Sequence, residues 1–180
     1  IERSDDVQDN YKRLTVTSAN VSTYTDSNVI DGTYYYYRIK TVTASEVNDA
    51  IEEIEVFTDI NVPTYLTGRS TSSQINLSWV DNSETESGFK IERSTNEINY
   101  AQIASVAADV STYIDSSVSG ESFYYYRVKA YQNSNNTESI YSGATALSTP
   151  SSEKGAGGLH WYLMLILLFM IRRSNPVRLK

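Results

Sequence analysis

The residues of this chain that could do chemistry begin with two acidic runs. Asp81, Glu84 and Glu86 offer hard oxygen ligands that could hold a calcium ion. Their spacing matches no standard calcium loop and lacks the usual glycine, so a solvated turn is the alternative interpretation. Residues 52–55 contain three glutamates that could form the carboxylate pair of a glycoside hydrolase. Because they lead into a strand pattern of alternating charge, a water-facing strand explains them more simply.

Two tyrosine runs form the other candidate site. The stretch "TYYYYRIKTV" at 33–42 returns as "SFYYYRVKAY" at 122–131, each time just before an Arg-x-Lys. Strand alternation leaves Tyr36 and Tyr125 facing outward, where they could make weak surface contacts with a protein or carbohydrate ligand. A sugar platform usually needs several coplanar exposed rings, whereas each copy offers one. A structural role for the runs is therefore the competing interpretation.

Composition narrows the function classes. The chain has no cysteine, which excludes disulfide frameworks, thiol catalysis and cysteine-ligated zinc sites. The net charge is −7, and basic residues near the C-terminus leave residues 1–150 at −11, so nucleic acid is not an expected partner. The single histidine, His160, adjoins an apolar segment with no Ser/Asp or metal partner nearby. We therefore predict no enzyme within this chain and no cofactor or metal.

An internal repeat shows which elements must position these residues. Residues 23–42 match residues 112–131 at a constant offset of 89, with ten identities in twenty positions, and the Ile-Glu-Arg-Ser of 1–4 returns at 91–94. A period near 90 residues is that of a small sandwich domain. About thirty residues of domain precede the second Ile-Glu-Arg-Ser, so we expect the chain to begin inside a domain.

The periodicity within the second copy is two, as in half-buried strands. Residues 75–79 and 89–92 alternate apolar with polar side chains. Further strands are expected at 101–107, 112–114, 123–131 and 142–148. No long amphipathic helix interrupts them, so the predicted fold is all-β, an immunoglobulin-like antiparallel sandwich. We assign 1–59 to a first domain that lacks its first two strands, and 60–149 to a second, complete domain.

An ordered set of motifs in the second copy resembles a fibronectin type III domain of the kind common in secreted bacterial proteins. The motifs are Pro63, Ile75-x-Leu77-x-Trp79, the strand from Gly88 to Arg93, "TYIDSSV" and Tyr124-x-Tyr126-x-Val128-x-Ala130. The resemblance covers about 88 residues, and its later half recurs in the first copy. It implies that Tyr124 and Tyr35 are tyrosine corners, whose hydroxyls bond to backbone near the preceding loop.

Strand alternation then assigns the neighbours of the corner residues. The side chains expected to face the core are those of Tyr37, Ile39, Tyr126 and Val128. On the outer face, Glu92 should lie across from Arg127, and Glu2 across from Arg38. Such exposed cross-strand pairs contribute about 0.2–1 kcal/mol each.

The C-terminal residues predict a membrane-directed tail. A Gly/Ser linker at 150–158 precedes an uncharged segment at 159–171, "LHWYLMLILLFMI", and a basic tail follows at 172–180. As a helix, the apolar segment would span about 20 Å against a hydrocarbon core of about 30 Å, which is marginal for crossing a bilayer. A buried helix of a soluble domain is the alternative, but nothing remains in the chain to cover a helix that is apolar on all sides.

The order of glycine pair, short apolar run, arginine pair and chain end resembles the GlyGly-CTERM sorting tails of Gram-negative bacteria. The resemblance implies cleavage near Gly157 and Gly158 by a rhomboid-like intramembrane protease, with Arg172 and Arg173 as the cytoplasmic flank. Delivery to the cell surface or the medium, with transient inner-membrane anchoring and type II secretion machinery as a partner, would follow. Seven residues continue beyond Arg173, so a permanent single-span anchor is the alternative.

Together these features predict a non-catalytic accessory region of a secreted or surface-attached bacterial protein. The fibronectin type III modules would act as spacers or weak binders, and an upstream hydrolase or peptidase domain would fit this arrangement. The alternative is an adhesin-like surface protein whose modules bind a protein or carbohydrate directly. No Arg-Gly-Asp sequence occurs to support that second role.

Overall fold

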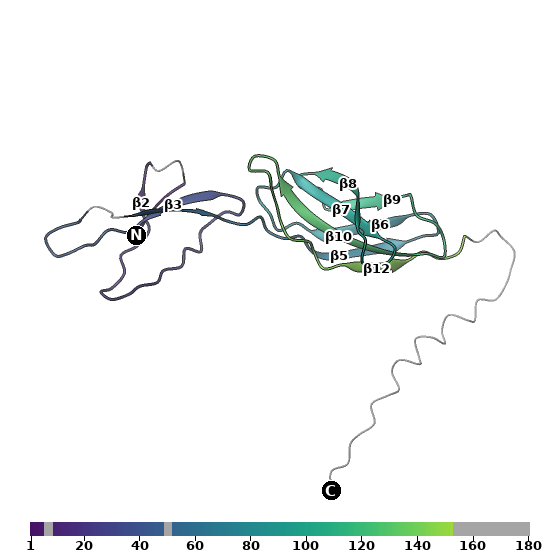
Figure 1. The fold of residues 1–180 in the computed structure, drawn as a ribbon, viewed down its shortest axis with the longest axis horizontal. Helices are drawn as coiled ribbons and strands as arrows, with labels where there is room; N and C mark the ends of the chain where they lie inside the picture. The colour runs from purple at the N-terminus through teal and green to yellow at the C-terminus, as the bar shows by residue number, and fades with distance from the viewer. Residues whose placement is uncertain (6–8, 49–51, 153–180) are drawn as a thin grey trace, which may run out of the picture.

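A computed structural model describes residues 1–5, 9–48 and 52–152. These residues form twelve β-strands and no helix, in two successive modules joined by a short extended segment (Figure 1). The first module is a single small sheet, and the second is a sandwich of two sheets. The all-β prediction is therefore confirmed for the described residues, while the predicted helix at 159–171 lies outside them.

The second module contains eight strands. They are β5 (Thr64–Ser70), β6 (Ile75–Val80), β7 (Gly88–Ser94), β8 (Ala101–Ala107), β9 (Thr112–Asp115), β10 (Phe123–Gln132), β11 (Thr137–Glu138) and β12 (Thr145–Ser148). One sheet has the order β5-β6-β9; the other has the order β11-β10-β7-β8, with β12 also paired to β10. All pairings are antiparallel, as short strands joined by turns favour.

The core of the second module lies between its two sheets and follows the period-two pattern. Ile75, Leu77 and Trp79 alternate inward along β6, and the Trp79 ring meets the ring of Phe89 edge-on at 5.6 Å between centroids. Every second residue of β10 from Tyr124 to Gln132 is buried. Because side chains on a strand point alternately to opposite faces, this pattern fixes which half of the tyrosine run is available at the surface.

The strands predicted at 101–107, 112–114 and 123–131 are confirmed to within a residue. The one predicted at 142–148 is shorter, because the chain between β11 and β12 pairs with β10 partly through serine side chains. The backbone amides of Ala130 and Val128 donate to the hydroxyls of Ser139 and Ser142, each at 3.0 Å. Hydroxyls replace carbonyls there, and the regular ladder is interrupted.

The first module repeats one sheet of the second. Its strands are β1 (Glu2–Ser4), β2 (Lys12–Arg13), β3 (Tyr34–Arg38) and β4 (Glu53–Phe57), in the order β2-β1-β3-β4. Tyr35 lies opposite Val56, as Tyr124 lies opposite Leu147. β1, β2, β3 and β4 thus correspond to β7, β8, β10 and β12. No strand in the described part of the first module corresponds to β5 or β6.

The missing opposing sheet corrects one expectation. Ile39 was predicted to be a core residue, but it is 69% exposed, whereas its counterpart Val128 is fully buried. Ile54 and Val56, which lie across from Tyr37 and Tyr35 on the neighbouring strand, are also exposed. The inner face of this sheet is apolar, yet nothing in the described residues covers it in the way that β5 and β6 cover the second module.

Candidate functional site

The outer face of β10 carries a compact group of paired charges and rings. Arg127 lies directly opposite Glu92 and donates to its carboxylate from Nε at 2.9 Å and from Nη2 at 2.6 Å. The same guanidinium lies between the rings of Tyr100 and Tyr141, 4.1 and 3.7 Å from their centroids. The predicted register is confirmed, and this arginine is engaged by partners within its own module.

The pKa of the Glu92 carboxyl reflects this environment. Burial alone would raise it, but hydrogen bonds from Tyr141 and Arg127 outweigh burial and lower the pKa below its ordinary value. Lys129 extends the group, because its ammonium lies 4.7 Å from the centre of the Tyr141 ring and pairs with Glu138. The charged residues of this face therefore stabilise one another.

The first module contains the same arrangement on β3. Arg38 lies opposite Glu2 and donates to its carboxylate from Nε at 2.6 Å, which lowers the pKa of Glu2. The Arg38 guanidinium lies 3.9 Å from the centre of the Tyr11 ring, and Lys40 approaches Glu2 at 3.5 Å. The predicted Glu2–Arg38 pair is thereby confirmed.

Tyr36 and Tyr125 lie on these outer faces, as alternation predicted. Both are half-buried; Tyr125 is paired with Ser94 across the sheet, and Tyr36 lies between Ser4 and Glu55. Each has an arginine two positions after it on its strand and an exposed aromatic residue two positions before it, Tyr34 in β3 and Phe123 in β10. Their role as weak contact residues for a protein or carbohydrate stays a prediction.

Both tyrosine corners are present. The hydroxyl of Tyr124 accepts a hydrogen bond from the backbone amide of Ser119 at 2.9 Å, and that of Tyr35 accepts one from the amide of Ile30 at 2.7 Å. Both rings are more than nine-tenths buried. Each corner fixes the loop before its strand at the same place in the repeat.

A buried polar triad, which no sequence pattern predicted, occurs in both modules. In the second module, the Asp115 carboxylate, 1% exposed, accepts hydrogen bonds from Arg93 Nη1 at 2.7 Å and from the Tyr126 hydroxyl at 2.9 Å. The first module has the same triad. Its members are Arg3, Asp26 and Tyr37, with bonds of 2.8 and 3.0 Å to Asp26.

The signal for the triad was present in the repeat. The aspartate belongs to the "TYxDS" that recurs at offset 89, and the arginine to the Ile-Glu-Arg-Ser that recurs at offset 90. Because the aspartate and the arginine are both repeated, the sequence indicated that both have a role in each copy. It could not show that they meet, because that depends on how the strands fold together.

Burial and hydrogen bonding shift the pKa values of the triad in opposite directions. Burial, followed by the bond to Asp26, raises the pKa of Tyr37 to about 12, and the same causes raise that of Tyr126. Burial would also raise the pKa of Asp115, but bonds from Ser117, Tyr126 and Arg93 lower it below the ordinary 3.8. The aspartate is therefore held ionised and the tyrosine protonated, as a structural ion pair requires.

The structure groups the acidic residues differently from the calcium hypothesis. Asp81 and Glu86 lie near Asp109, with carboxylate oxygens within 4.8 Å of one another, while Glu84 is not part of this group. Glu86 accepts a hydrogen bond from the Asp109 amide at 3.1 Å. Burial and the neighbouring carboxylates raise the pKa of Asp81. The glutamates Glu53 and Glu55 of the other acidic run are exposed on β4, as a water-facing strand predicts.

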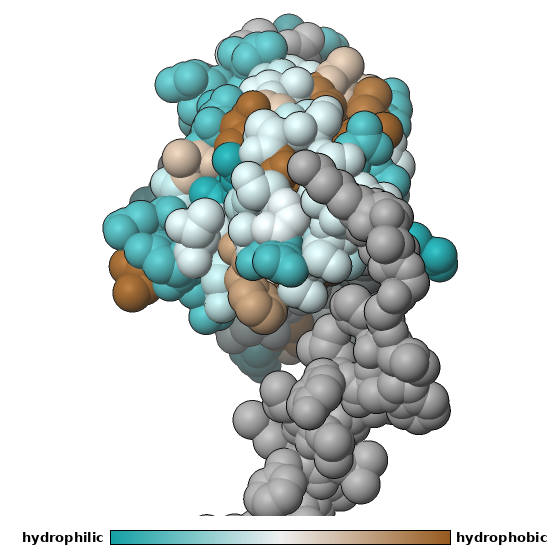
Figure 2. All heavy atoms as spheres, turned by 90° about the vertical axis from the view of Figure 1, so that its right-hand side faces the viewer, coloured by the Kyte–Doolittle hydropathy of each residue, from teal (hydrophilic) through white to brown (hydrophobic). Residues whose placement is uncertain are grey.

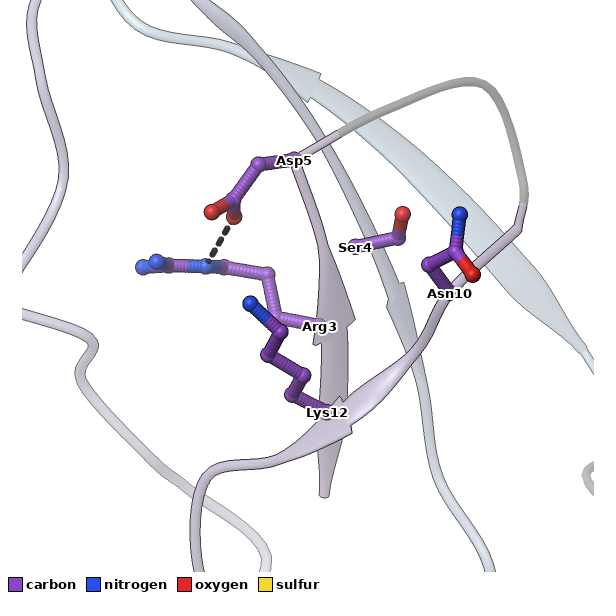
Figure 3. A pocket seen from close by; sticks show the side chains of 5 residues that line it. All are labelled: Arg3, Ser4, Asp5, Asn10 and Lys12. Atoms are coloured by element: carbon purple, nitrogen blue, oxygen red, sulfur yellow. Dashed lines mark hydrogen bonds and ion pairs between the residues drawn. The ribbon is translucent and has the colours of Figure 1, made fainter.

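Two shallow recesses lie beside the first module. One, of about 140 Å³, is lined by Arg3, Asp5, Lys12 and neighbours, and its arginine already pairs with Asp5 at 2.8 Å (Figure 3). The second, of about 350 Å³, lies where the modules meet, between Tyr34 and Tyr36 on one side and residues 132–135 on the other. Neither is a deep apolar pocket of the kind that holds a small-molecule substrate.

The far end of the second module is mostly hydrophilic or neutral, with scattered hydrophobic patches (Figure 2). The predicted sorting residues Gly157, Gly158, Arg172 and Arg173, like His160, lie outside the described residues. Within the described ranges, no helix is long and apolar enough to cross a membrane.

We compared the chain with known protein families, curated proteins and solved structures. No family model and no curated protein matches the chain. A two-domain fibronectin type III segment of chicken tenascin matches with a TM-score of 0.55 and 12% identity over 66% of each chain. A Fn3-like protein from Clostridium thermocellum matches at 27% identity and a TM-score of 0.41, over 51% of this chain and 94% of that one.

A β-1,2-glucanase from Parabacteroides distasonis also matches, at 21% identity and a TM-score of 0.47 over 59% of this chain. The chain spans only 15% of the length of that enzyme. The tenascin match, at 12% identity, shows fold alone. Together with the two tyrosine corners and the sandwich topology of the second module, it shows that the described part of this chain is built from antiparallel β-modules of fibronectin type III fold.

Proposed function

We propose that this chain is a non-catalytic accessory region of a secreted or surface-attached Gram-negative bacterial protein, in which fibronectin type III modules act as spacers or weak binders. The observation that supports it best is the end-to-end arrangement of the modules (Figure 1). Arg38 and Arg127 on the outer faces are used in pairs within their own sheets. Such an arrangement supplies length and surface rather than a convergent catalytic pocket.

The proposal includes a C-terminal sorting or anchoring signal at 157–173. Its support is the glycine pair, the uncharged segment and the arginine pair in the sequence. The partners would be the inner membrane, a rhomboid-like processing protease and the secretion machinery. The site of action would be the cell surface or the extracellular medium.

A reporter fusion tests the sorting signal. A secreted reporter enzyme is fused ahead of Ile1 and expressed in a Gram-negative host that carries a rhomboid-like protease and type II secretion. We expect the reporter at the cell surface or in the medium. Replacing Gly157 and Gly158 with leucine should trap the full-length fusion in membranes, whereas leucine at Gly155 and Ala156 is the matched control. Unchanged release of the first variant would contradict processing at the glycine pair.

The recess between the modules favours a second candidate, direct binding by an adhesin-like protein. Tyr34, Tyr36 and Asn135 are among the residues that line it, and a lining of aromatic and amide residues suits a carbohydrate. Retention of the purified chain on immobilised oligosaccharides separates the two roles, because a spacer needs no ligand.

A further inference from the structure

The turn at Asp31 and Gly32 is where the first module meets the second. Asp31 is only 7% exposed although it lies in a loop. Its carboxylate accepts hydrogen bonds from the backbone amides of Asn61 in the connecting segment, at 2.9 Å, and of Glu84 in the second module, at 3.1 Å. Its carbonyl accepts a third bond, from the Thr85 hydroxyl at 3.0 Å. The Asp31 carboxylate thus binds both the connecting segment and the neighbouring module.

Gly32 brings the two backbones close together. Its φ of +59° lies in the left-handed region, and a Cβ at this position would stand 2.5 Å from the Thr85 hydroxyl. Asn135 on the second module donates to the Gly32 carbonyl at 3.3 Å. A side chain here would have to displace the Thr85 and Gln132 side chains of the second module and would strain the backbone, so the sequence Asp-Gly suits this contact at both positions.

The second module holds its side of the contact in place. Gln132, 8% exposed, donates to the Thr85 carbonyl at 3.0 Å and accepts a bond from Asn135 at 3.0 Å. Asn82 and Asn61 tie the connecting segment down, because Asn82 donates to the Val62 carbonyl and Asn61 donates to the Asn82 carbonyl. The second module therefore holds the Thr85 backbone at the contact through its own Gln132.

The repeat shows that this contact belongs to one copy. At offset 89, Gly120 and Glu121 occupy the positions of Asp31 and Gly32. There the Glu121 amide bonds to the Thr149 carbonyl of its own module at 3.0 Å. The second copy has no carboxylate at the first position and a side chain at the second, so it lacks both features of the docking turn.

We propose that the Asp31–Gly32 turn is a module-recognition site that couples a module to its C-terminal neighbour and makes the pair a single rigid rod. The neighbour that it fits presents a backbone amide free to donate, followed by a residue with a hydroxyl, as the 84–85 loop does. The site has no counterpart in the second copy, where Gly120 and Glu121 stand at its two positions. This inference rests on the proposed spacer function and specifies it as a stiff spacer.

Distance measurements between two spin labels test the coupling in the 180-residue chain in mild detergent. Since the chain has no cysteine, Glu55→Cys on β4 and Ala101→Cys on β8 give one label in each module. We expect a narrow distance distribution for the parent and at least a doubling of its width for Asp31→Ala and for Gly32→Ala. Gly143→Ala is the control, because a Cβ there meets no atom within 4 Å.

Thr85→Val is a second variant, which still tests the contact if a substitution in the Asp31–Gly32 turn unfolds part of the first module. It removes the hydroxyl from the side of the second module and should widen the distribution in the same way. A parent distribution as wide as that of Asp31→Ala, or no widening in Thr85→Val, would overturn the proposal. The distance measurement uses purified protein, so its result does not depend on whether the chain is sorted to the cell surface. A broad distance distribution in a chain that is sorted normally would refute the coupling of the modules and leave the proposed spacer function in place.

Discussion

At the scale of single residues, the Tyr124 hydroxyl stabilises the loop before β10. It is the acceptor for the Ser119 amide, and the Tyr124 ring is 7% exposed. Tyr124→Phe leaves that amide without its partner, so we expect a loss of about 1–3 kcal/mol in the unfolding free energy of the second module. Urea unfolding followed by tryptophan fluorescence measures it. Tyr125→Phe, one position along on the outer face, is the control, and equal midpoints for parent and Tyr124→Phe would refute the corner assignment.

The Asp115 triad predicts how stability depends on pH. The folded pKa of Asp115 lies below its ordinary 3.8, so its contribution is complete above about pH 4 and is lost as the pH falls through the folded value. Asp115→Asn leaves Arg93 without its charge partner and should cost about 3–5 kcal/mol at pH 7. The urea midpoint of the variant should change less between pH 6 and pH 3 than that of the parent. If the urea midpoints of parent and variant changed equally with pH, the pKa of Asp115 would be the same in the folded and unfolded states.

At the scale of elements, two equivalent positions of the repeat show that the burial of a side chain depends on the neighbouring sheet as well as on its own strand. Ile39, the residue that follows β3, corresponds in the repeat to Val128 on β10, but Ile39 is 69% exposed and Val128 is fully buried. Val128→Ala should therefore cost about 2 kcal/mol, whereas Ile39→Ala should stay within about 0.5 kcal/mol. Thermal unfolding of both variants checks this. A similar large loss for Ile39→Ala would mean that its face is covered in solution.

The register of the sheets could be predicted because it depends on local periodicity. Alternation along β7 and β10, together with the expectation that these two strands are antiparallel neighbours, led to the hypothesis that Glu92 lies opposite Arg127, and the repeat carried the same pairing to Glu2 and Arg38. The exposure of Ile39 could not be predicted in this way, since burial depends on a second sheet and not on the strand itself. The pairing of Asp115 with Arg93 could not be predicted for a related reason, because the two residues are 22 positions apart in the sequence and no periodic pattern connects them.

At the scale of the whole molecule, the sequence indicated two modules but not how they meet. The contact is made by Asp31 and Gly32 in one loop and by Thr85 and Asn135 in two others. Loops have no periodicity, and Asp-Gly is an ordinary turn sequence, so no pattern distinguishes a docking turn from a free one. The acidic group around Asp81 illustrates the same limit, because Asp109 joins it from another loop.

The repeated triad has a consequence for how this chain folds. β1 and β7 both carry Glu-Arg-Ser, and β3 and β10 both carry the tyrosine and arginine that lie opposite these residues. Either first strand thus offers the correct ion pairs to either second strand, so exchange between modules is chemically permitted. Tandem domains of high internal identity are prone to such strand exchange during folding. Correct assembly then depends on the shorter connection closing first, which favours each strand finding the partner within its own module.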